Sequence, residues 1–201
     1  MKTHSIRRPN GFTLVELLVV IAIIAVLAGA GFAAGNAAIQ KAKKTTAMAT
    51  CTALESAVNN YYTEYGAMPT AATTDLPVIK TDNDTLLKVL LGLEGTTPTY
   101  NTRSIKFLSV KEGKKKGTTG MNGLIYNTAG TGVTGLYDPW GGVYNVMLDG
   151  DYNETLNGVK PKGSTTSVTL SGRRVAAWSD GADGASTGNG TAADDVVTWN
   201  K

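Results

Sequence analysis

The chain has 201 residues, a formal net charge of +3, one histidine and one cysteine. The histidine, His4, lies in a basic N-terminal segment that we expect to be removed, and Cys51 has no partner for an intrachain disulfide. Histidine-dependent catalysis and histidine-ligated zinc are therefore excluded, and we do not expect an enzyme.

The positive charge is concentrated at the N-terminus. Three of the 19 basic residues are Lys2, Arg7 and Arg8, and without them the chain has 16 basic and 16 acidic residues. A chain that is neutral beyond its first residues offers no charge argument for nucleic-acid binding, so none is predicted. The 24 glycines, with many threonines and asparagines in the second half, indicate an outward-facing part that is rich in loops.

The first predicted element is a long apolar helix. Residues 17–35 contain no charged side chain, which is about the length that spans a bilayer. Glu16 interrupts the apolar run near its start. Because a carboxylate in hydrocarbon is costly, Glu16 is a candidate functional residue whose partner must be found.

The order of basic leader, Gly11, Phe12-Thr13-Leu14-Val15-Glu16 and apolar helix resembles the prepilin signal of type IV pilins and type II secretion pseudopilins. In that family, a prepilin peptidase cuts after the glycine on the cytoplasmic side and methylates the new N-terminus. The resemblance implies a leader over residues 1–11, cleavage between Gly11 and Phe12, and N-methylation of Phe12. The Phe12 amine of one subunit and Glu16 of its neighbour would then neutralise each other during assembly.

Two other interpretations of this segment stay open. One is an ordinary secretory signal peptide, cleaved near the small residues Ala28-Gly29-Ala30, ahead of a secreted binding domain. The other is a plain membrane anchor. Both leave Glu16 unexplained, and a secretory signal needs an apolar core of only about 7–15 residues.

The helix is predicted to continue past residues 12–35, the membrane or filament-core part, into an amphipathic part over residues 36–66. Its apolar face follows alternating spacings of four and three residues. The residues of that face are Ala47, Cys51, Leu54, Val58, Tyr61 and Tyr65. Gly66, with Pro69 shortly after it, is expected to end the helix.

Residues 67–136 are predicted to form a variable, loop-rich insert with one short helix over residues 84–91. Residues 104–110 are expected to form a strand or to lead into one, and residues 117–135 to form an exposed loop. Between them lies a basic segment, for which a solvated turn is favoured over a surface for an acidic partner. Its lysines are Lys111, Lys114, Lys115 and Lys116.

Residues 137–201 are predicted to hold a small antiparallel sheet that packs against the helix, giving an α+β fold. The strands are expected over residues 143–148, 168–170 and 174–178. A tight turn precedes the first strand, and it consists of Asp138, Pro139, Trp140 and Gly141. This turn resembles the start of the sheet in the major pseudopilin of type II secretion. The resemblance implies the type IV pilin fold, with Trp140 packed on the long helix.

The C-terminal residues 179–199 resemble the loop that holds a structural Ca²⁺ in the major pseudopilins. The resemblance implies ligand roles for Asp183, Asp195, Asp194 and Ser179. Carboxylate and carbonyl oxygens from a polar, glycine-rich loop suit a hard cation. Ala193 stands where the family usually has an acidic residue, which departs from the pattern. The alternative is an acidic loop without metal, with Trp199 packed back on the head.

A second candidate metal site lies at Asp149, Asp151 and Asn153, which alternate like the first ligands of an EF-hand loop. Glu154 stands where that loop needs a glycine, and Lys160 stands where its bidentate glutamate belongs. The pattern therefore favours a hairpin turn between two strands.

The resemblance covers residues 1–70 and 137–201. It implies a structural subunit of a type II secretion pseudopilus that polymerises through its N-terminal helix, anchored by one span in the inner membrane with its head in the periplasm. The expected partners are further copies of the chain, the prepilin peptidase, an inner-membrane platform with its ATPase, and minor pseudopilins. The alternative is a major or minor pilin of a surface type IV pilus, used for adhesion, motility or DNA uptake.

Overall fold

The computed structural model describes residues 12–75, 79–82, 84–117, 119–127, 132–161, 166–184 and 195–199, without the side chains of residues 30–34, 84, 116, 119, 183 and 184. The predicted leader with Gly11, the whole of Asp194 and the side chain of Asp183 thus lie outside the described residues. The chain divides into two units, Met1–Ala42 and Lys43–Lys201.

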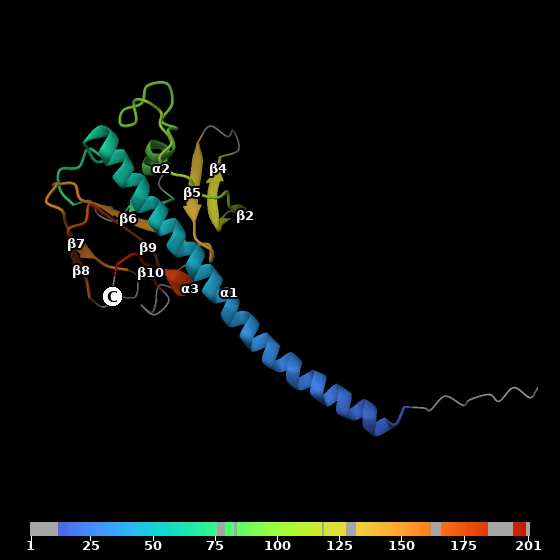
Figure 1. The fold of residues 1–201 in the computed structure, drawn as a ribbon. Helices are drawn as coiled ribbons and strands as arrows, with labels where there is room; N and C mark the ends of the chain where they lie inside the picture. The colour runs from blue at the N-terminus through green and yellow to red at the C-terminus, as the bar shows by residue number, and fades with distance from the viewer. Residues whose placement is uncertain are drawn as a thin grey trace, which may run out of the picture. The chain divides into compact units, whose positions relative to one another are not determined.

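Helix α1 runs from Leu14 to Tyr65 (Figure 1). It ends as predicted, because Gly66 adopts a left-handed φ of 67° while its N–H donates to the Tyr62 carbonyl at 2.8 Å. The predicted apolar face is confirmed within the second unit. Five of its residues are at most 2% exposed, and these are Ala47, Cys51, Leu54, Val58 and Tyr61.

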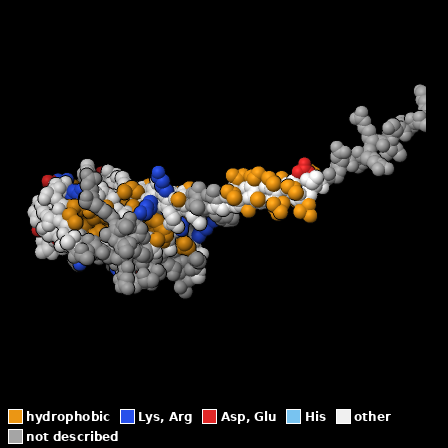
Figure 2. Space-filling view, turned by 90° about the horizontal axis from the view of Figure 1, so that it is seen from below, with side chains coloured by type: hydrophobic (Ala, Val, Ile, Leu, Met, Phe, Trp, Pro, Cys, Tyr) orange, Lys and Arg blue, Asp and Glu red, His pale blue; other side chains and the backbone are white. Residues whose placement is uncertain are grey.

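The part of α1 in the first unit presents apolar side chains to its surroundings (Figure 2). The large hydrophobic side chains between Phe12 and Leu27 are 45–79% exposed. An exposed apolar surface of this extent marks contact with lipid or with another protein. Among the described residues, no helix reaches the combination of length and apolar character that crossing a membrane requires.

The central sheet of the second unit has four antiparallel strands in the order β1-β6-β9-β10. Their bounds are β1 Ile79–Lys80, β6 Tyr144–Leu148, β9 Val175–Ser179 and β10 Val196–Val197. The two central strands agree closely with the predicted ranges. An N-terminal helix followed by a small antiparallel sheet confirms the α+β prediction and is consistent with the type IV pilin fold.

This central sheet is buried on both faces. Val146 and Ala177, which are paired across β6 and β9, belong to the main core together with the buried residues of α1. Ala176 and Trp178, which alternate with Ala177 along β9, belong to a second core. That core is closed by a hairpin of β7 (Thr155–Val159) and β8 (Val168–Ser171).

The prediction of an exposed loop over residues 117–135 is wrong, because this region forms paired strands. Strand β2 (Lys114–Lys116) pairs with β3 (Thr119–Met121), and β4 (Gly123–Tyr126) pairs with β5 (Val133–Tyr137). Three side chains anchor these strands in the main core: Leu124, Val133 and Leu136. Gly120 is a packing position, since a Cβ there would lie 2.1 Å from Cδ2 of Tyr137.

The short helix is confirmed as α2, Asp84–Leu91. Residues 104–110 form no strand themselves but lead toward β2, which is the second of the two expected outcomes. The N–H groups of Phe107 and Leu108 each donate to the Leu90 carbonyl at 2.9 Å, so this segment satisfies the C-terminal end of α2. The single turn α3, Gly181–Gly184, follows β9.

Candidate functional site

Glu16 closes the first turn of α1 in a reciprocal arrangement with Thr13. The backbone N–H and the hydroxyl group of Thr13 donate to Oε2 of Glu16 at 2.9 and 2.8 Å. The N–H of Glu16 donates back to the Thr13 hydroxyl oxygen at 3.2 Å. This geometry is a capping box, which satisfies N–H groups that a helix start otherwise leaves without partners. The capping role of Thr13 was not predicted from the sequence, although a threonine three residues before a glutamate is the signature of this motif.

The capping box fixes the carboxylate of Glu16 through Oε2 and leaves Oε1 available as an acceptor. Only Oε2 accepts hydrogen bonds from described residues. Phe12, four residues before Glu16, is 76% exposed. A cationic donor brought in by another molecule can therefore reach Oε1 without breaking the cap.

The turn Asp138–Gly141 is built around a buried carboxylate. Oδ1 of Asp138 accepts the N–H groups of Trp140 and Gly142, both at 2.9 Å. Oδ2 accepts the Ser179 hydroxyl group at 2.7 Å, and Gly141 takes a φ of 98°. Burial raises the pKa of Asp138, and the hydrogen bonds from Ser179 and the turn oppose that shift. The turn is thus fastened to the end of β9, and Trp140 packs against the main core.

Of the four predicted calcium ligands, two are fully described and lie close together in the fold. Val196 pairs with Ser179, so Asp195 enters the sheet beside the end of β9. Asp195 is 7% exposed. The Ser179 hydroxyl group donates to Asp138 and accepts the Gly181 N–H at 3.2 Å, so the fold already uses this side chain. Carboxylate and hydroxyl oxygens are ligands that a hard cation such as Ca²⁺ accepts.

Trp199 packs back on the head as the alternative interpretation expected. Its ring meets that of Trp178 edge-on, with centroids 5.8 Å apart and planes at 80°. Both rings belong to the second core.

The second candidate site brings together Asp75, Asp149 and Asp151, which we name the acidic corner. One carboxylate oxygen of each lies within 4.8 Å of the others. Asp149 is fully buried, and it accepts the N–H groups of Asn153 at 3.1 Å and Glu154 at 2.8 Å. Burial, together with the nearby Asp151, raises the pKa of Asp149. Asp75 was missed because it is distant in sequence and no local pattern marks it.

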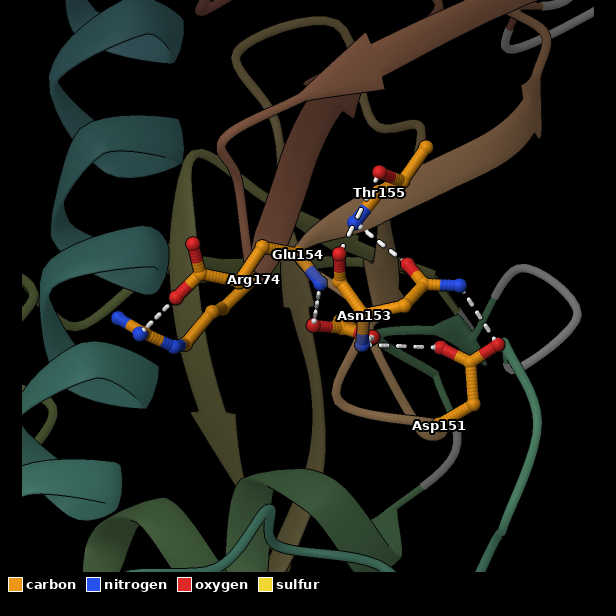
Figure 3. Close-up of polar contacts among 6 residues, drawn as sticks. Asp151, Asn153, Glu154, Thr155 and Arg174 are labelled. Atoms are coloured by element: carbon orange, nitrogen blue, oxygen red, sulfur yellow. Dashed lines mark hydrogen bonds and ion pairs between the residues drawn. The ribbon is translucent and has the colours of Figure 1, made fainter.

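Two members of the acidic corner, Asp149 and Asp151, lie in a structured turn that is not a hairpin turn. This turn connects β6 to β7, and β6 pairs with β9 whereas β7 pairs with β8. Tyr152 and Glu154 take positive φ values of 60° and 57°. Glu154 forms an ion pair with Arg174, which lies on the side of the turn away from Asp151 (Figure 3).

Residues 6–32 match the family model described as the prokaryotic N-terminal methylation motif. The match includes the predicted cleavage position between Gly11 and Phe12 as well as Glu16. No curated protein and no solved structure matches the chain. The motif supports a type IV pilin-like subunit, either a pilin or a pseudopilin, that is processed by a prepilin peptidase and joins a filament. It also fits anchoring in a membrane before assembly.

Proposed function

We propose that this chain is the major pseudopilin of a type II secretion system, a structural subunit whose fibre supports protein export. The observation that carries the proposal is the methylation motif joined to a helix whose apolar side chains are exposed. A helix of this kind is stable when lipid or copies of the same helix cover it. Cleavage between Gly11 and Phe12, followed by N-methylation of Phe12, would prepare the subunit for transfer from lipid to fibre.

The capping box suggests how each new subunit finds its position. Thr13 holds Oε2 of Glu16, and Oε1 remains for the Phe12 amine of the neighbouring subunit. In an apolar fibre core, a single unpaired charge is strongly destabilising, and a paired one is not. A subunit that stops at the wrong height leaves both charges without partners, so the pairing gives the fibre its register.

In this proposal, the subunit is held in the inner membrane by one span, with its head in the periplasm. Its partners are other copies, the prepilin peptidase, minor pseudopilins, and an inner-membrane platform with an ATPase. The ATPase is required because the sequence contains no nucleotide-binding motif that would drive extension from within the subunit.

We also propose a structural Ca²⁺ in the C-terminal loop, with Asp195 as its central ligand. Asp183, Asp194 and Ser179 are the further candidates. The position of Asp195 supports this site, because pairing of β10 with β9 brings its carboxylate close to Ser179, and carboxylate oxygens are ligands that Ca²⁺ prefers. Bound Ca²⁺ would fasten the C-terminal loop, a role that no intrachain disulfide can take in a chain with one cysteine.

The alternative, a pilin of a surface type IV pilus, draws support from the region between the helix and the turn at Asp138. This region adds α2 and two hairpins to the head, and added surface of this kind can decorate a fibre exposed outside the cell.

Deletion of the gene distinguishes a pseudopilin from a surface pilin when secreted enzymes and surface fibres are measured in parallel. Exoproteins retained inside the cell, with surface fibres unchanged, are expected for a pseudopilin. Loss of fibres with normal secretion would establish the alternative. N-terminal sequencing of the membrane-bound protein tests processing, and a start near Gly31 would reject both in favour of a secretory signal.

A further inference from the structure

An exposed strip of lysines lies on the head, and we name Lys111, Lys114 and Lys115 the lysine ribbon. All three are exposed, and within the described part of the chain no ion pair reaches them. The single acidic residue among them, Glu112, leaves the ribbon with a net positive charge. The segment is held firmly, since the Gly113 N–H donates to the Leu124 carbonyl at 2.8 Å and the Leu124 N–H donates to the Lys111 carbonyl at 3.0 Å.

The acidic corner carries the opposite charge to the lysine ribbon. Asp75, Asp149 and Asp151 take part in no ion pair with any described residue, and their like charges repel one another at this separation. Asp151 is the exposed member, while Asp149 behind it is fully buried. The neighbouring Glu154 does not add to this charge, because Arg174 neutralises it (Figure 3). The corner therefore presents an unbalanced negative charge at a fixed place.

The two surfaces lie on opposite sides of α1 within the second unit. Figure 1 shows β2, which carries Lys114 and Lys115, on one side of the helix, and the connection from β6 to β7 on the other. When copies stand side by side with their helices parallel, the positive side of each head faces the negative side of the next. Such a contact is heterologous, so it can repeat from copy to copy, and in an open helical filament it does so without closing on itself.

We propose that the lysine ribbon of one subunit docks on the acidic corner of its neighbour. The inference rests on the proposed filament and adds a second contact to it, made by the heads. A second copy is the occupant favoured by charge complementarity, because it satisfies both surfaces at once, whereas a metal ion in the corner would leave the ribbon without a partner. Exposed charge pairs select partners and register more than they add affinity, so the contact aligns heads whose helices already associate.

Charge reversal in the full-length chain tests the contact. Lys114→Glu/Lys115→Glu is expected to reduce the fibre fraction released by shearing about tenfold, because like charges then face each other. Asp151→Lys is expected to cause a similar loss, and combining the three changes is expected to restore most of the fibre. The matched control is Lys80→Glu/Lys160→Glu, which makes the same charge change at exposed lysines outside both surfaces.

Disulfide trapping gives a second measurement that does not depend on fibre yield. The pair Lys115→Cys/Asp151→Cys is expected to form cross-linked ladders, whereas Lys160→Cys/Asp151→Cys is not. Native Cys51 does not interfere, because it is fully buried and burial raises the pKa of its thiol. Since the Asp151 carboxylate accepts two hydrogen bonds from Asn153, thermal melts must show that each Asp151 variant is folded, and Asp151→Asn serves as the milder variant.

The outcomes separate this inference from the proposed function. Absence of fibres from the unmodified protein would overturn the filament itself. Fibres from Lys114→Glu/Lys115→Glu at the level of the control would overturn only the head contact. Loss of fibres in Asp151→Asn, with normal assembly of the lysine variant, would also overturn it, because the corner would then act without the ribbon. Failure of the combined variant to recover, while it remains folded, would count against the pairing in the same way.

Discussion

Glu55, on α1, accepts a hydrogen bond from the hydroxyl group of Thr198, 143 residues further along the chain. The same carboxylate oxygen accepts the Ala177 N–H at 3.2 Å and lies 3.5 Å from Nη1 of Arg173. Nη2 of Arg173 donates in turn to the Thr198 carbonyl at 3.3 Å. One carboxylate thus joins the helix, β9 and the C-terminal segment.

This junction predicts a large effect of Glu55→Ala on stability. The Glu55 side chain is only 16% exposed, and its removal leaves donors on Arg173, Ala177 and Thr198 without an acceptor. We expect the free energy of unfolding to fall by about 2 kcal/mol, as measured by urea denaturation of the purified full chain in detergent. The control is Glu64→Ala, which breaks an ion pair with Arg103 whose side chains are 35% and 66% exposed. Its expected loss is below about 1 kcal/mol, and equal losses would contradict the prediction.

The two roles of Glu16, helix cap and charge partner, can be separated by substitution. Glu16→Gln keeps a side chain that serves in a capping box but removes the charge. We expect normal cleavage before Phe12 and no fibres. Thr13→Ala keeps the charge and removes the cap, at a cost of about 1 kcal/mol at the helix start, so fibres should still form. Mass spectrometry of the N-terminus and the sheared-fibre assay measure the two steps. Normal fibres from Glu16→Gln would show that assembly does not need the charge of Glu16.

The proposed Ca²⁺ site predicts a calcium-dependent melting temperature. A ligand at about 100 times its Kd stabilises the folded state by about 2.7 kcal/mol, so a chelator should lower the melting temperature of the unmodified protein. Asp195→Asn is expected to abolish this response. Asp151→Asn, at the acidic corner, is the control and should keep it. A response lost in the control and kept in Asp195→Asn would move the metal to the acidic corner.

The buried hydroxyl group of Tyr61 leads us to expect a loss of folding stability at high pH. Its hydroxyl group donates to the Tyr100 carbonyl at 2.9 Å, and burial, with a smaller effect of nearby Glu94, raises the pKa of Tyr61 to about 12. The unfolded chain loses this proton near pH 10. Between these values the folded state binds more protons, so stability falls as the pH rises.

Tyr61→Phe should therefore lose about 1 kcal/mol at pH 7, where the hydrogen bond is intact, and show a shallower decline above pH 10. Urea denaturation of both proteins at pH 7 and pH 11 measures the difference. The same slope in both proteins would mean that Tyr61 does not contribute to the alkaline transition.

The helical parts of the fold could be predicted from the sequence because their signals are local. The alternating spacing of Leu54, Val58 and Tyr61 reports directly on a buried helix face, and Gly66 marks the end of α1. Glu16 was identified because a carboxylate in an apolar run is conspicuous. The strands between Lys114 and Tyr137 gave no such signal.

Those strands were missed because their stability depends on partners distant in sequence. Gly120 was interpreted as a loop residue, but it leaves room for the Tyr137 ring. Asp75 joins Asp149 only after the chain has folded. Pairing and close approach of this kind depend on tertiary structure, which composition does not record.

Strand β9 contributes alternate side chains to two separate cores. Inherited change is therefore most restricted there, since either face of the strand meets packed neighbours. We expect lineages of this subunit to diverge more readily in the connections between strands than in β9. New surfaces can then arise on the head without altering the framework on which every copy is built.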